Sequence, residues 1–275
     1  MRVFISADME GIAGVNRGAE TEPFQPGWER SCRLMTGEVN AAIEGALEGG
    51  AQEIVVNDGH WLGNNLLLDE LNPAAEVISG YPRPLSMAEG IGPNFDAAFF
   101  IGYHASAGTQ DAVLDHTYAD PRHVMEVRLR GRAQSEGSLN GYACGAFGCP
   151  VVLFTGDSTA VSQMHEFCLE VEGVVVKEAV SREAARSLHP LVVRDRIRTG
   201  ARRALERLPN IQPMRLDGSP DFEVDFQSVA LADACMRVPG VERAGPRTVR
   251  CSGADYLEAF RLFLALVDLA GTAGP

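Results

Sequence analysis

The chain has 275 residues, of which 45% are hydrophobic and 22% charged, and its formal net charge is −13 at pH 7. This composition is typical of a globular protein with one large or two modest domains, and the negative charge argues against nucleic acid or an anionic membrane surface as the main partner. Six scattered cysteines, with no apolar segment long enough to cross a bilayer and no signal-peptide pattern, predict a cytoplasmic protein with reduced, mostly buried thiols.

The first predicted strand covers residues 3–7 and ends in two carboxylates, Asp8 and Glu10. Because side chains alternate along a strand, these two lie on one face where the strand ends. Gly11 allows the following loop to pass close to whatever lies there. Neighbouring carboxylates repel each other unless a cation or a proton lies between them, so the pair indicates either a metal site or simply an acidic turn.

Two further apolar runs end in histidine. The first covers residues 54–56 and leads to His60, and the second covers residues 97–103 and leads to His104. A helix predicted over residues 28–47 makes the first two strands a parallel βαβ unit, and ligands of open α/β sheets bind outside the carboxyl ends of such strands. Imidazole together with carboxylate favours zinc or a related transition metal.

A polar loop over residues 105–120 follows the strand that leads to His104, and we expect it to be mobile and functional. It contains His116. A half-exposed strand is predicted over residues 124–130, and a helix begins at Ser135 and Glu136. In that first turn Glu136 is either an electrostatic cap of the helix or a carboxylate directed at a metal.

The rest of the chain predicts two regions. Residues 150–180 read as strand, helix and strand, and an arginine-rich helical region follows from residue 181 to 208, interrupted at Pro190. Residues 222–269 predict a strand, a helix, two strands and a very apolar helix. We therefore expect an α/β fold with a three-layer catalytic, metal-binding domain over residues 1–180. A smaller α+β domain over residues 181–275 would contribute to assembly and substrate access.

Several short sequences occur in a fixed order along the chain: Ser6-Ala7-Asp8-Met9-Glu10-Gly11, Asn57-Asp58-Gly59-His60, Ser86-Met87-Ala88-Glu89-Gly90, Gly102-Tyr103-His104, Asp115-His116-Thr117, and Glu136 with Leu139-Asn140. Together they resemble the zinc-dependent D-aminopeptidase family found in dipeptide-transport operons. The similarity extends over essentially the whole chain and is strongest before Asp157.

The resemblance implies a site with two zinc ions. Asp8 matches the residue that bridges both ions, Glu10 and His60 match the ligands of one ion, and His104 and Glu136 match those of the other. It also implies substrates that contain D-amino acids, and a homodecamer of two stacked rings that encloses the active sites.

His116 matches a catalytic histidine near the metals. The chain departs from the family around Glu136, with Ser135 before it and Gly141 after Asn140, where the family usually has Gly and Ala. Two zinc ions that share a carboxylate can hold a hydroxide between them. His116 would then attack directly, transfer a proton or stabilise an oxyanion, and the sequence leaves these roles open.

These observations predict a metal-dependent aminopeptidase that hydrolyses the N-terminal residue of short, D-amino-acid-containing peptides. Two alternatives remain at this point. One is a dinuclear metal phosphoesterase, because strand ends rich in Asp and His also suit phosphoryl chemistry. The other is a non-catalytic protein that uses the same fold to bind peptides.

Overall fold

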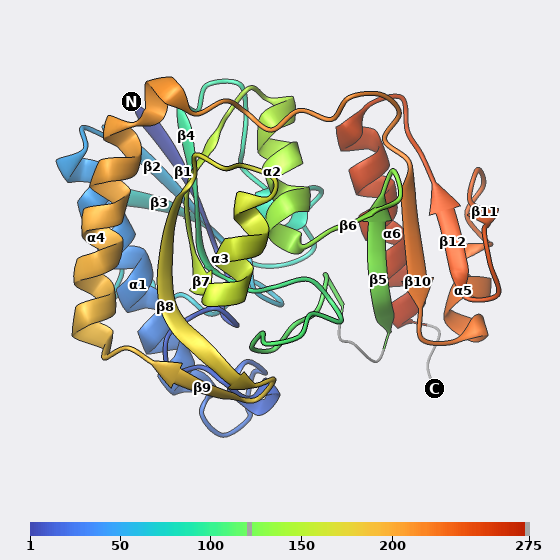
Figure 1. The fold of residues 1–275 in the computed structure, drawn as a ribbon, viewed down its shortest axis with the longest axis horizontal. Coiled ribbons are helices and arrows are strands. Elements are labelled where there is room, and N and C mark those ends of the chain that lie inside the picture. Colours follow the sequence, from blue (N-terminus) through green and yellow to red (C-terminus); the bar gives the residue numbers. More distant parts are fainter. Residues whose placement is uncertain (120–122, 273–275) are drawn as a thin grey trace.

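The larger of two sheets holds the strand ends singled out above. The computed structural model describes residues 1–119 and 123–272, and in it seven strands form a sheet in the order β3-β2-β1-β4-β7-β8-β9 (Figure 1). Their bounds are β1 (Arg2–Ala7), β2 (Glu53–Asp58), β3 (Ala75–Ile78), β4 (Ala97–Tyr103), β7 (Val151–Asp157), β8 (Glu172–Ser181) and β9 (Ala184–Ser187). All neighbours in this sheet are parallel except β8 and β9, which are antiparallel.

Helices cover both faces of this sheet. Figure 1 shows α1 (Trp28–Glu48) and α4 (Pro190–Glu206) on one face, and α2 (Glu136–Ala146) and α3 (Ser158–His165) on the other. Because both faces are covered, β1, β4 and β7 are buried almost throughout, as expected for parallel strands. The predicted three-layer α/β fold is confirmed.

The smaller sheet is antiparallel and has five strands in the order β11-β12-β10-β5-β6. Its strands are β5 (Val124–Leu129), β6 (Arg132–Ala133), β10 (Phe222–Phe226), β11 (Glu242–Arg243) and β12 (Thr248–Cys251). Helices α5 (Val229–Cys235) and α6 (Tyr256–Gly271) accompany it, and three short 3₁₀ helices complete the described elements: η1 (Gly18–Glu20), η2 (Ser86–Ala88) and η3 (Leu208–Asn210). This sheet and its helices form an α+β unit.

The two sheets divide the chain differently from the predicted boundary after residue 180. Elements β9 and α4 lie beyond that boundary but belong to the larger sheet and its helical layer, whereas β5 and β6 precede it and belong to the smaller sheet. The sequence indicates the type of each element but not its partner across the sheet. A role of residues 181–275 in assembly and substrate access stays a prediction.

The helical region predicted from residue 181 is wrong up to residue 188. Residues 184–187 form β9, which pairs with β8 through a tight turn, and the helix begins only at Pro190. Pairing with β8 overrides the helical preference of alanine and arginine in this segment. Proline at the first helical position is compatible with a helix start, because its missing N–H has no partner there anyway.

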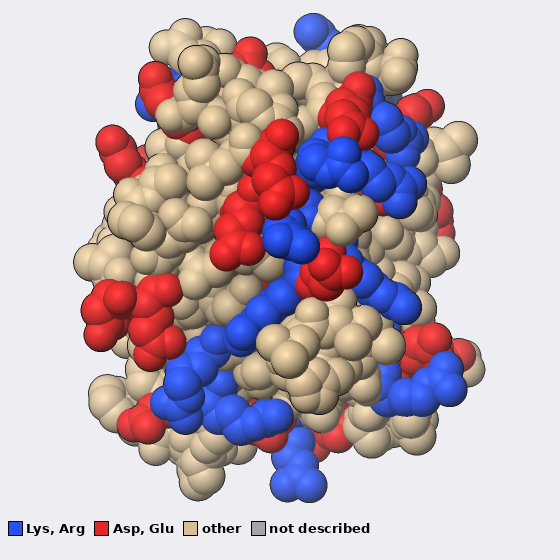
Figure 2. All heavy atoms as spheres, turned by 90° about the vertical axis from the view of Figure 1, so that its left-hand side faces the viewer, with Lys and Arg blue, Asp and Glu red and all other residues tan. Residues whose placement is uncertain are grey.

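Most arginines of α4 lie on a charged face of the molecule. Figure 2 shows basic and acidic side chains next to each other on the side that α4 occupies in Figure 1. Arg202 pairs with Glu206 at 2.6 Å, and Arg203 and Arg207 both pair with Glu172. These arginines thus pair with nearby acidic residues.

The apolar residues of α6 are covered within the chain itself. Phe263 is fully buried, stacks on Phe222 at 5.0 Å and contacts Tyr118 edge-on at 5.4 Å. Leu266 is also fully buried. The smaller sheet and the segment that carries Tyr118 therefore cover the buried side of α6 together.

Two further features bear on the expectations from composition. No helix among the described residues is long and apolar enough to span a membrane. Each of the six cysteines is free and buried, and burial raises the pKa of Cys149 to about 12.

Candidate metal centre

The three strand ends meet at one edge of the larger sheet. Strand β1 lies between β2 and β4 and is parallel to both, so all three end on the same side. Asp8 directly follows β1, His104 directly follows β4, and His60 follows β2 by two residues. All three side chains are almost completely buried. This part of the site is arranged as the sequence predicts.

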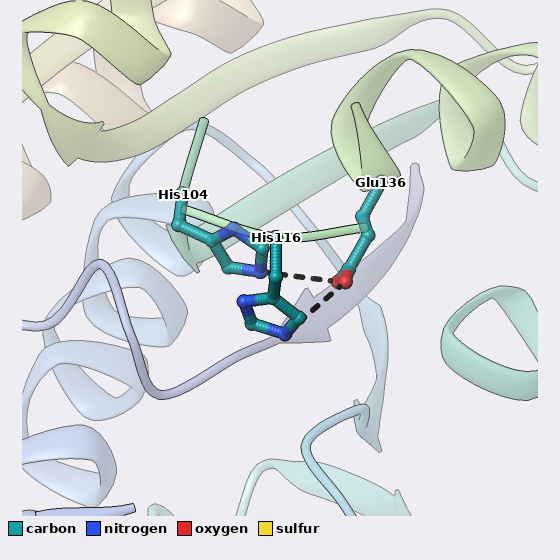
Figure 3. A group of neighbouring side chains, drawn as sticks. All are labelled: His104, His116 and Glu136. Atoms are coloured by element: carbon teal, nitrogen blue, oxygen red, sulfur yellow. Dashed lines mark ion pairs between the residues drawn. The ribbon is translucent and has the colours of Figure 1, made fainter. Parts of the chain in front are cut away.

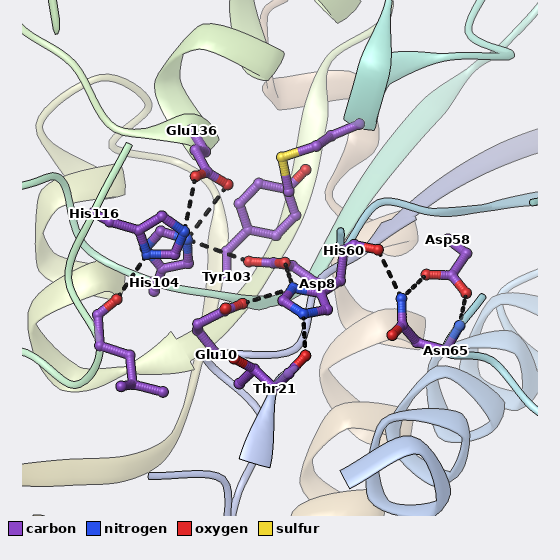
Figure 4. A network of polar contacts seen from close by, with 12 residues as sticks. Asp8, Glu10, Thr21, Asp58, His60, Asn65, Tyr103, His104, His116 and Glu136 are labelled. Carbon is purple, nitrogen blue, oxygen red and sulfur yellow. Dashed lines mark hydrogen bonds and ion pairs between the residues drawn. The ribbon is translucent and has the colours of Figure 1, made fainter. Parts of the chain in front are cut away.

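Asp8 lies between the two histidines (Figure 4). Its Oδ1 is 3.3 Å from Nδ1 of His60, and its Oδ2 is 3.4 Å from Nε2 of His104. The backbone N–H of Asp8 donates to the carbonyl of Ile101 at 2.8 Å, which continues the pairing of β1 with β4. The carboxylate thus faces one histidine with each oxygen.

A second carboxylate accompanies each histidine. Oε2 of Glu10 is 3.0 Å from Nδ1 of His60, and Oε2 of Glu136 is 3.3 Å from Nε2 of His104. The cluster therefore consists of two histidine–glutamate pairs with Asp8 between them. The structure brings together all five residues that the sequence nominates as metal ligands.

Close approach of two backbone segments makes this geometry possible at Gly11. A Cβ atom at this position would lie 2.0 Å from the carbonyl oxygen of Tyr103, so only glycine fits between the loop after β1 and the end of β4. The N–H of Gly11 donates to the carbonyl of Gly102 at 2.7 Å. Glu10 is thereby held next to the strand that carries His104.

His116 lies beside the pair of His104 and Glu136. Its ring stacks on that of His104, with centroids 4.0 Å apart, and its Nε2 is 3.5 Å from Oε1 of Glu136 (Figure 3). Nitrogen and oxygen atoms of these three residues lie within 4.8 Å of one another, as do those of Asp8, Glu10 and His104. The side chain of His116 is 18% exposed, more than those of the five residues around it.

A backbone carbonyl orients each of the three rings. Nε2 of His60 is 2.9 Å from the carbonyl of Thr21, and Nδ1 of His104 and of His116 face the carbonyls of residues 105 and 114 at 3.0 and 2.8 Å. A carbonyl only accepts hydrogen bonds, so in the neutral ring the nitrogen that faces it carries the hydrogen. The opposite nitrogen, which faces the carboxylates, then has a free lone pair.

Glu136 lies in the first turn of α2, but the hydrogen-bonding cap of this helix is another residue. Ser135 is the N-cap residue of α2, and its side chain accepts from the backbone N–H of Ser138 at 3.1 Å. The carboxylate of Glu136 instead accepts from the backbone N–H of Tyr118 at 2.6 Å and faces His104. Of the two interpretations that the sequence allows, the structure has the carboxylate directed into the cluster.

Hydrogen bonds and an ion pair anchor the loop that carries His116. The backbone N–H of Val113 donates to the Asp157 carboxylate at 2.8 Å, and that of Gly108 donates to the Asp115 carboxylate at 2.8 Å. Arg182 in turn pairs with Asp115 at 2.9 Å. The anchors from Asp157 and Arg182 come from distant parts of the chain, so the sequence of the loop does not reveal them. Asp120, the last residue of the predicted loop, lies outside the described residues.

The electrostatics of the cluster favour cations. Burial, with the nearby Glu10 carboxylate, raises the pKa of Asp8 to about 7. Burial alone would lower the pKa of His104, but the Glu136 carboxylate and then Asp8 raise it to about 10. Burial and the neighbouring His104 lower the pKa of His116. Crowded carboxylates in a site shielded from water therefore attract positive charge.

Three buried polar atoms of the cluster have no hydrogen-bond partner: Oδ2 of Asp8, Oε2 of Glu10 and Nε2 of His104. Such atoms are rare in folded proteins and often mark an ion or a water site. All three face the centre of the cluster, beside a cavity of about 580 Å³. The cavity walls include Arg83 and Arg182 as well as Leu264, Val267 and Asp268 of α6.

The sequence gives little indication of the residues that support the cluster. Tyr118 donates its N–H to Glu136, while its hydroxyl donates to Asn140 at 2.7 Å. The orienting carbonyl groups leave no trace in a sequence, because every residue has one. His165 bonds to the carbonyl of Val171 and His189 caps α4, so these two histidines have structural contacts.

Comparison with known proteins identifies similar chains. Residues 1–265 match the family model described as D-aminopeptidase. A D-aminopeptidase of Bacillus subtilis (strain 168) is 32% identical over 271 residues, which cover 98% of both chains. The solved structure of the Zn-dependent D-aminopeptidase DppA from Bacillus subtilis, described as a self-compartmentalizing protease, matches with a TM-score of 0.95 and 32% identity over 98% of each chain.

Proposed function

Because the chain belongs to the D-aminopeptidase family, we propose that it is a metal-dependent aminopeptidase that removes the N-terminal residue from short peptides containing D-amino acids. The position of Asp8 supports this proposal independently of family membership. Its two oxygens face two separate histidine–glutamate pairs, and a dinuclear hydrolytic site needs a shared ligand of this kind.

The residues of the cluster fit zinc. Imidazole nitrogen and carboxylate oxygen are common zinc ligands, and three such atoms are buried here without a partner. A structural relative is described as zinc-dependent. We assign Glu10 and His60 to one zinc ion, His104 and Glu136 to a second, and Asp8 to both.

Bound zinc lowers the pKa of a coordinated water to about 7 and polarises a peptide carbonyl. His116 reaches both the cluster and the cavity, because its ring contacts Glu136 and also lines the cavity wall. From there its Nε2 transfers a proton, stabilises an oxyanion or attacks the substrate directly. A cavity of about 580 Å³ accommodates a ligand of a few residues rather than a folded protein.

We also propose a closed homo-oligomer, a decamer by resemblance to the family. The structural relative is described as self-compartmentalizing, which is a property of assemblies that enclose their active sites. Exposed aromatic residues support an interface: Phe24 is 95% exposed, and Trp61 is 52% exposed at the cavity wall. Location in the cytoplasm stays a prediction.

Metal content and stereochemical preference, measured together, test the function. The zinc-loaded chain should cleave D-alanyl p-nitroanilide at least about tenfold faster than the L-alanyl compound, and a chelator should abolish both reactions. p-Nitrophenyl phosphate serves as the control substrate. Turnover of the phosphoester alone would favour a phosphoesterase, and metal binding without any turnover would favour a peptide-binding protein. A chain that binds no metal would contradict the proposal.

A further inference from the structure

Lysine occurs once in this chain. Lysine and arginine together number 24, and Lys177 is the only lysine among them. The basic side chains on the charged face in Figure 2 are therefore arginines. Lys177 lies on β8 instead, and only 1% of it is exposed. Of the lysine and arginine positions, this buried one holds the lysine and all the others hold arginine.

The contacts of Lys177 explain this choice. Its Nζ lies 2.5 Å from the carbonyl oxygen of Glu10, 3.0 Å from that of Ile12 and 2.5 Å from that of Val15. An ammonium group has three N–H donors, so each donor has one acceptor here. A guanidinium group holds its donors in a flat, wider fork, which does not match three carbonyl groups converging on one point.

The segment that Lys177 contacts begins in the candidate metal centre. Residues 10–15 begin two residues after Asp8, and Glu10 is both the first residue held by the lysine and a candidate ligand. The same segment is held from other sides. The N–H of Ala13 donates to Glu38 on α1 at 2.9 Å, and the N–H of Gly14 donates to Ser187 on β9 at 3.1 Å. Lys177 is thus one of several distant groups that shape this loop.

We propose that Lys177 is a positioning residue of the metal centre, whose ammonium group holds the backbone of residues 10–15 and thereby keeps the carboxylate of Glu10 beside His60. This inference rests on the proposed function, because it assigns a metal to that pair. Lys177 contacts only backbone carbonyls in these hydrogen bonds, so it acts through Glu10. Its loss should weaken the half-site of Glu10 and His60 and spare the half-site of His104 and Glu136.

Zinc binding by Lys177→Met tests the proposal. Methionine has a similar length but no donors, so residues 10–15 lose three hydrogen bonds. Competition with a chelator measures the affinity for each of the two ions. We expect one affinity to fall about 10–100-fold, the usual loss when a group that orients a ligand is removed, and the other to change less than about threefold.

Val176→Ala is the matched control. Val176 is the preceding residue on β8, is fully buried and donates none of the three hydrogen bonds to residues 10–15, so its truncation weakens the same strand without removing a hydrogen bond to the loop. This variant should lose stability but keep both zinc affinities. Equal zinc affinities in Lys177→Met and Val176→Ala would show that Lys177 has only a structural role and would overturn the proposal.

A second variant covers the case in which Lys177→Met does not fold. Lys177→Arg keeps the positive charge in the buried site but not the convergent donors. We expect it to bind one zinc ion as the wild type does and the other more weakly. Wild-type affinity for both ions in Lys177→Arg would overturn the proposed role of Lys177 but not the proposed function. A wild-type chain that binds no zinc would overturn the proposed function as well.

Discussion

One side chain, Asp8, belongs to both halves of the cluster. Each of its oxygens faces a different histidine, whereas Glu10 faces only His60 in the ion pairs of the site. A ligand shared by two ions contributes to the binding of both, and a ligand of one ion contributes mainly to that one. The two residues therefore differ in what their removal should do.

Asp8→Ala should release more zinc than Glu10→Ala. We expect Asp8→Ala to lose both ions under conditions in which Glu10→Ala still retains roughly one, because only Asp8 contacts both pairs. Metal analysis after gel filtration at a fixed free zinc concentration measures the difference. Identical zinc content in the two variants would argue against the bridging role of Asp8.

His116 differs from the assigned ligands in its exposure and surroundings. It is the most exposed residue of the cluster, and its Nδ1 is held by the carbonyl of Leu114, so its Nε2 faces the shared space of Glu136 and the cavity. It is also close enough to Glu136 and His104 to serve as a ligand. Substitution of His116 distinguishes a catalytic role from a role as a metal ligand.

His116→Ala should fold, retain both zinc ions and lose about 10²–10⁴-fold in turnover, the usual effect of removing one proton-transfer group or oxyanion donor. His116→Gln can still donate a hydrogen bond, so recovery of turnover in this variant would indicate oxyanion stabilisation. His189→Ala, which affects a surface cap of α4, is the control and should keep full turnover. Loss of zinc from His116→Ala would identify a ligand, and unchanged turnover would exclude a catalytic role.

At the scale of the element, α1 contributes a buried carboxylate to the loop after β1. Glu38 accepts the N–H of Ala13, and burial raises its pKa to about 7 from an ordinary value of 4.5, although Lys177 and Arg194 oppose this shift. The folded chain therefore keeps this proton to higher pH than the unfolded chain does. Consequently the free energy of unfolding falls as pH rises from 4.5 to 7, and the change levels off above pH 7.

Glu38→Gln should remove this dependence. Glutamine keeps an acceptor for Ala13 but cannot ionise, so the variant should be more stable than the wild type at pH 8, by up to about 3 kcal/mol, and equally stable near pH 4. Denaturant unfolding at several pH values measures the difference. Glu44→Gln on the exposed side of α1 should show no such gain. A difference that does not vary with pH would contradict the raised pKa.

The sequence predicts the elements that build the site better than it predicts their partners. The ends of β1, β2 and β4 are predictable because apolar runs stop at polar side chains, and parallel strands share an edge. Strand β9 is not, because its residues favour a helix until β8 offers a partner. The assignment of β5 to the smaller sheet likewise depends on a strand almost a hundred residues away.

The candidate ligands show the same limit. Asp8, His60 and His104 follow from their positions at strand ends, whereas the direction of the Glu136 carboxylate is visible only from the Ser135 cap and the Tyr118 contact. Lys177 carries a visible signal, since it is the single lysine of the chain. Its meaning depends on three carbonyl groups more than 160 residues away, which no local pattern reveals.

At the scale of the whole molecule, the open question is assembly. The interior of the chain covers Phe263 and Leu266 of α6, so the case for an interface rests on the structural relative described as self-compartmentalizing and on exposed residues such as Phe24 and Trp61. Closed symmetric oligomers are the usual way to cover such surface.

Light scattering coupled to gel filtration should give a mass of about ten times the 29.5 kDa of one chain at micromolar concentration. High salt should not dissociate the assembly if apolar contacts hold it together, because salt screens charges and strengthens apolar burial. A monomer at this concentration would contradict the proposed oligomer, and a smaller closed oligomer would contradict the number ten.

The smaller sheet combines strands from two distant parts of the chain, and this affects the order in which the protein folds during synthesis. All six candidate site residues precede residue 137. Strand β5 can pair with β10 only after β10 has been synthesised, because β10 lies between β5 and β12 in the sheet. Helix α6 is synthesised last and completes the cavity wall. A growing chain therefore exposes the metal-binding edge before its cavity exists, with the edge of β5 still without its main partner. The proposed metal would then have access to these residues before the final helix adds its part of the cavity wall.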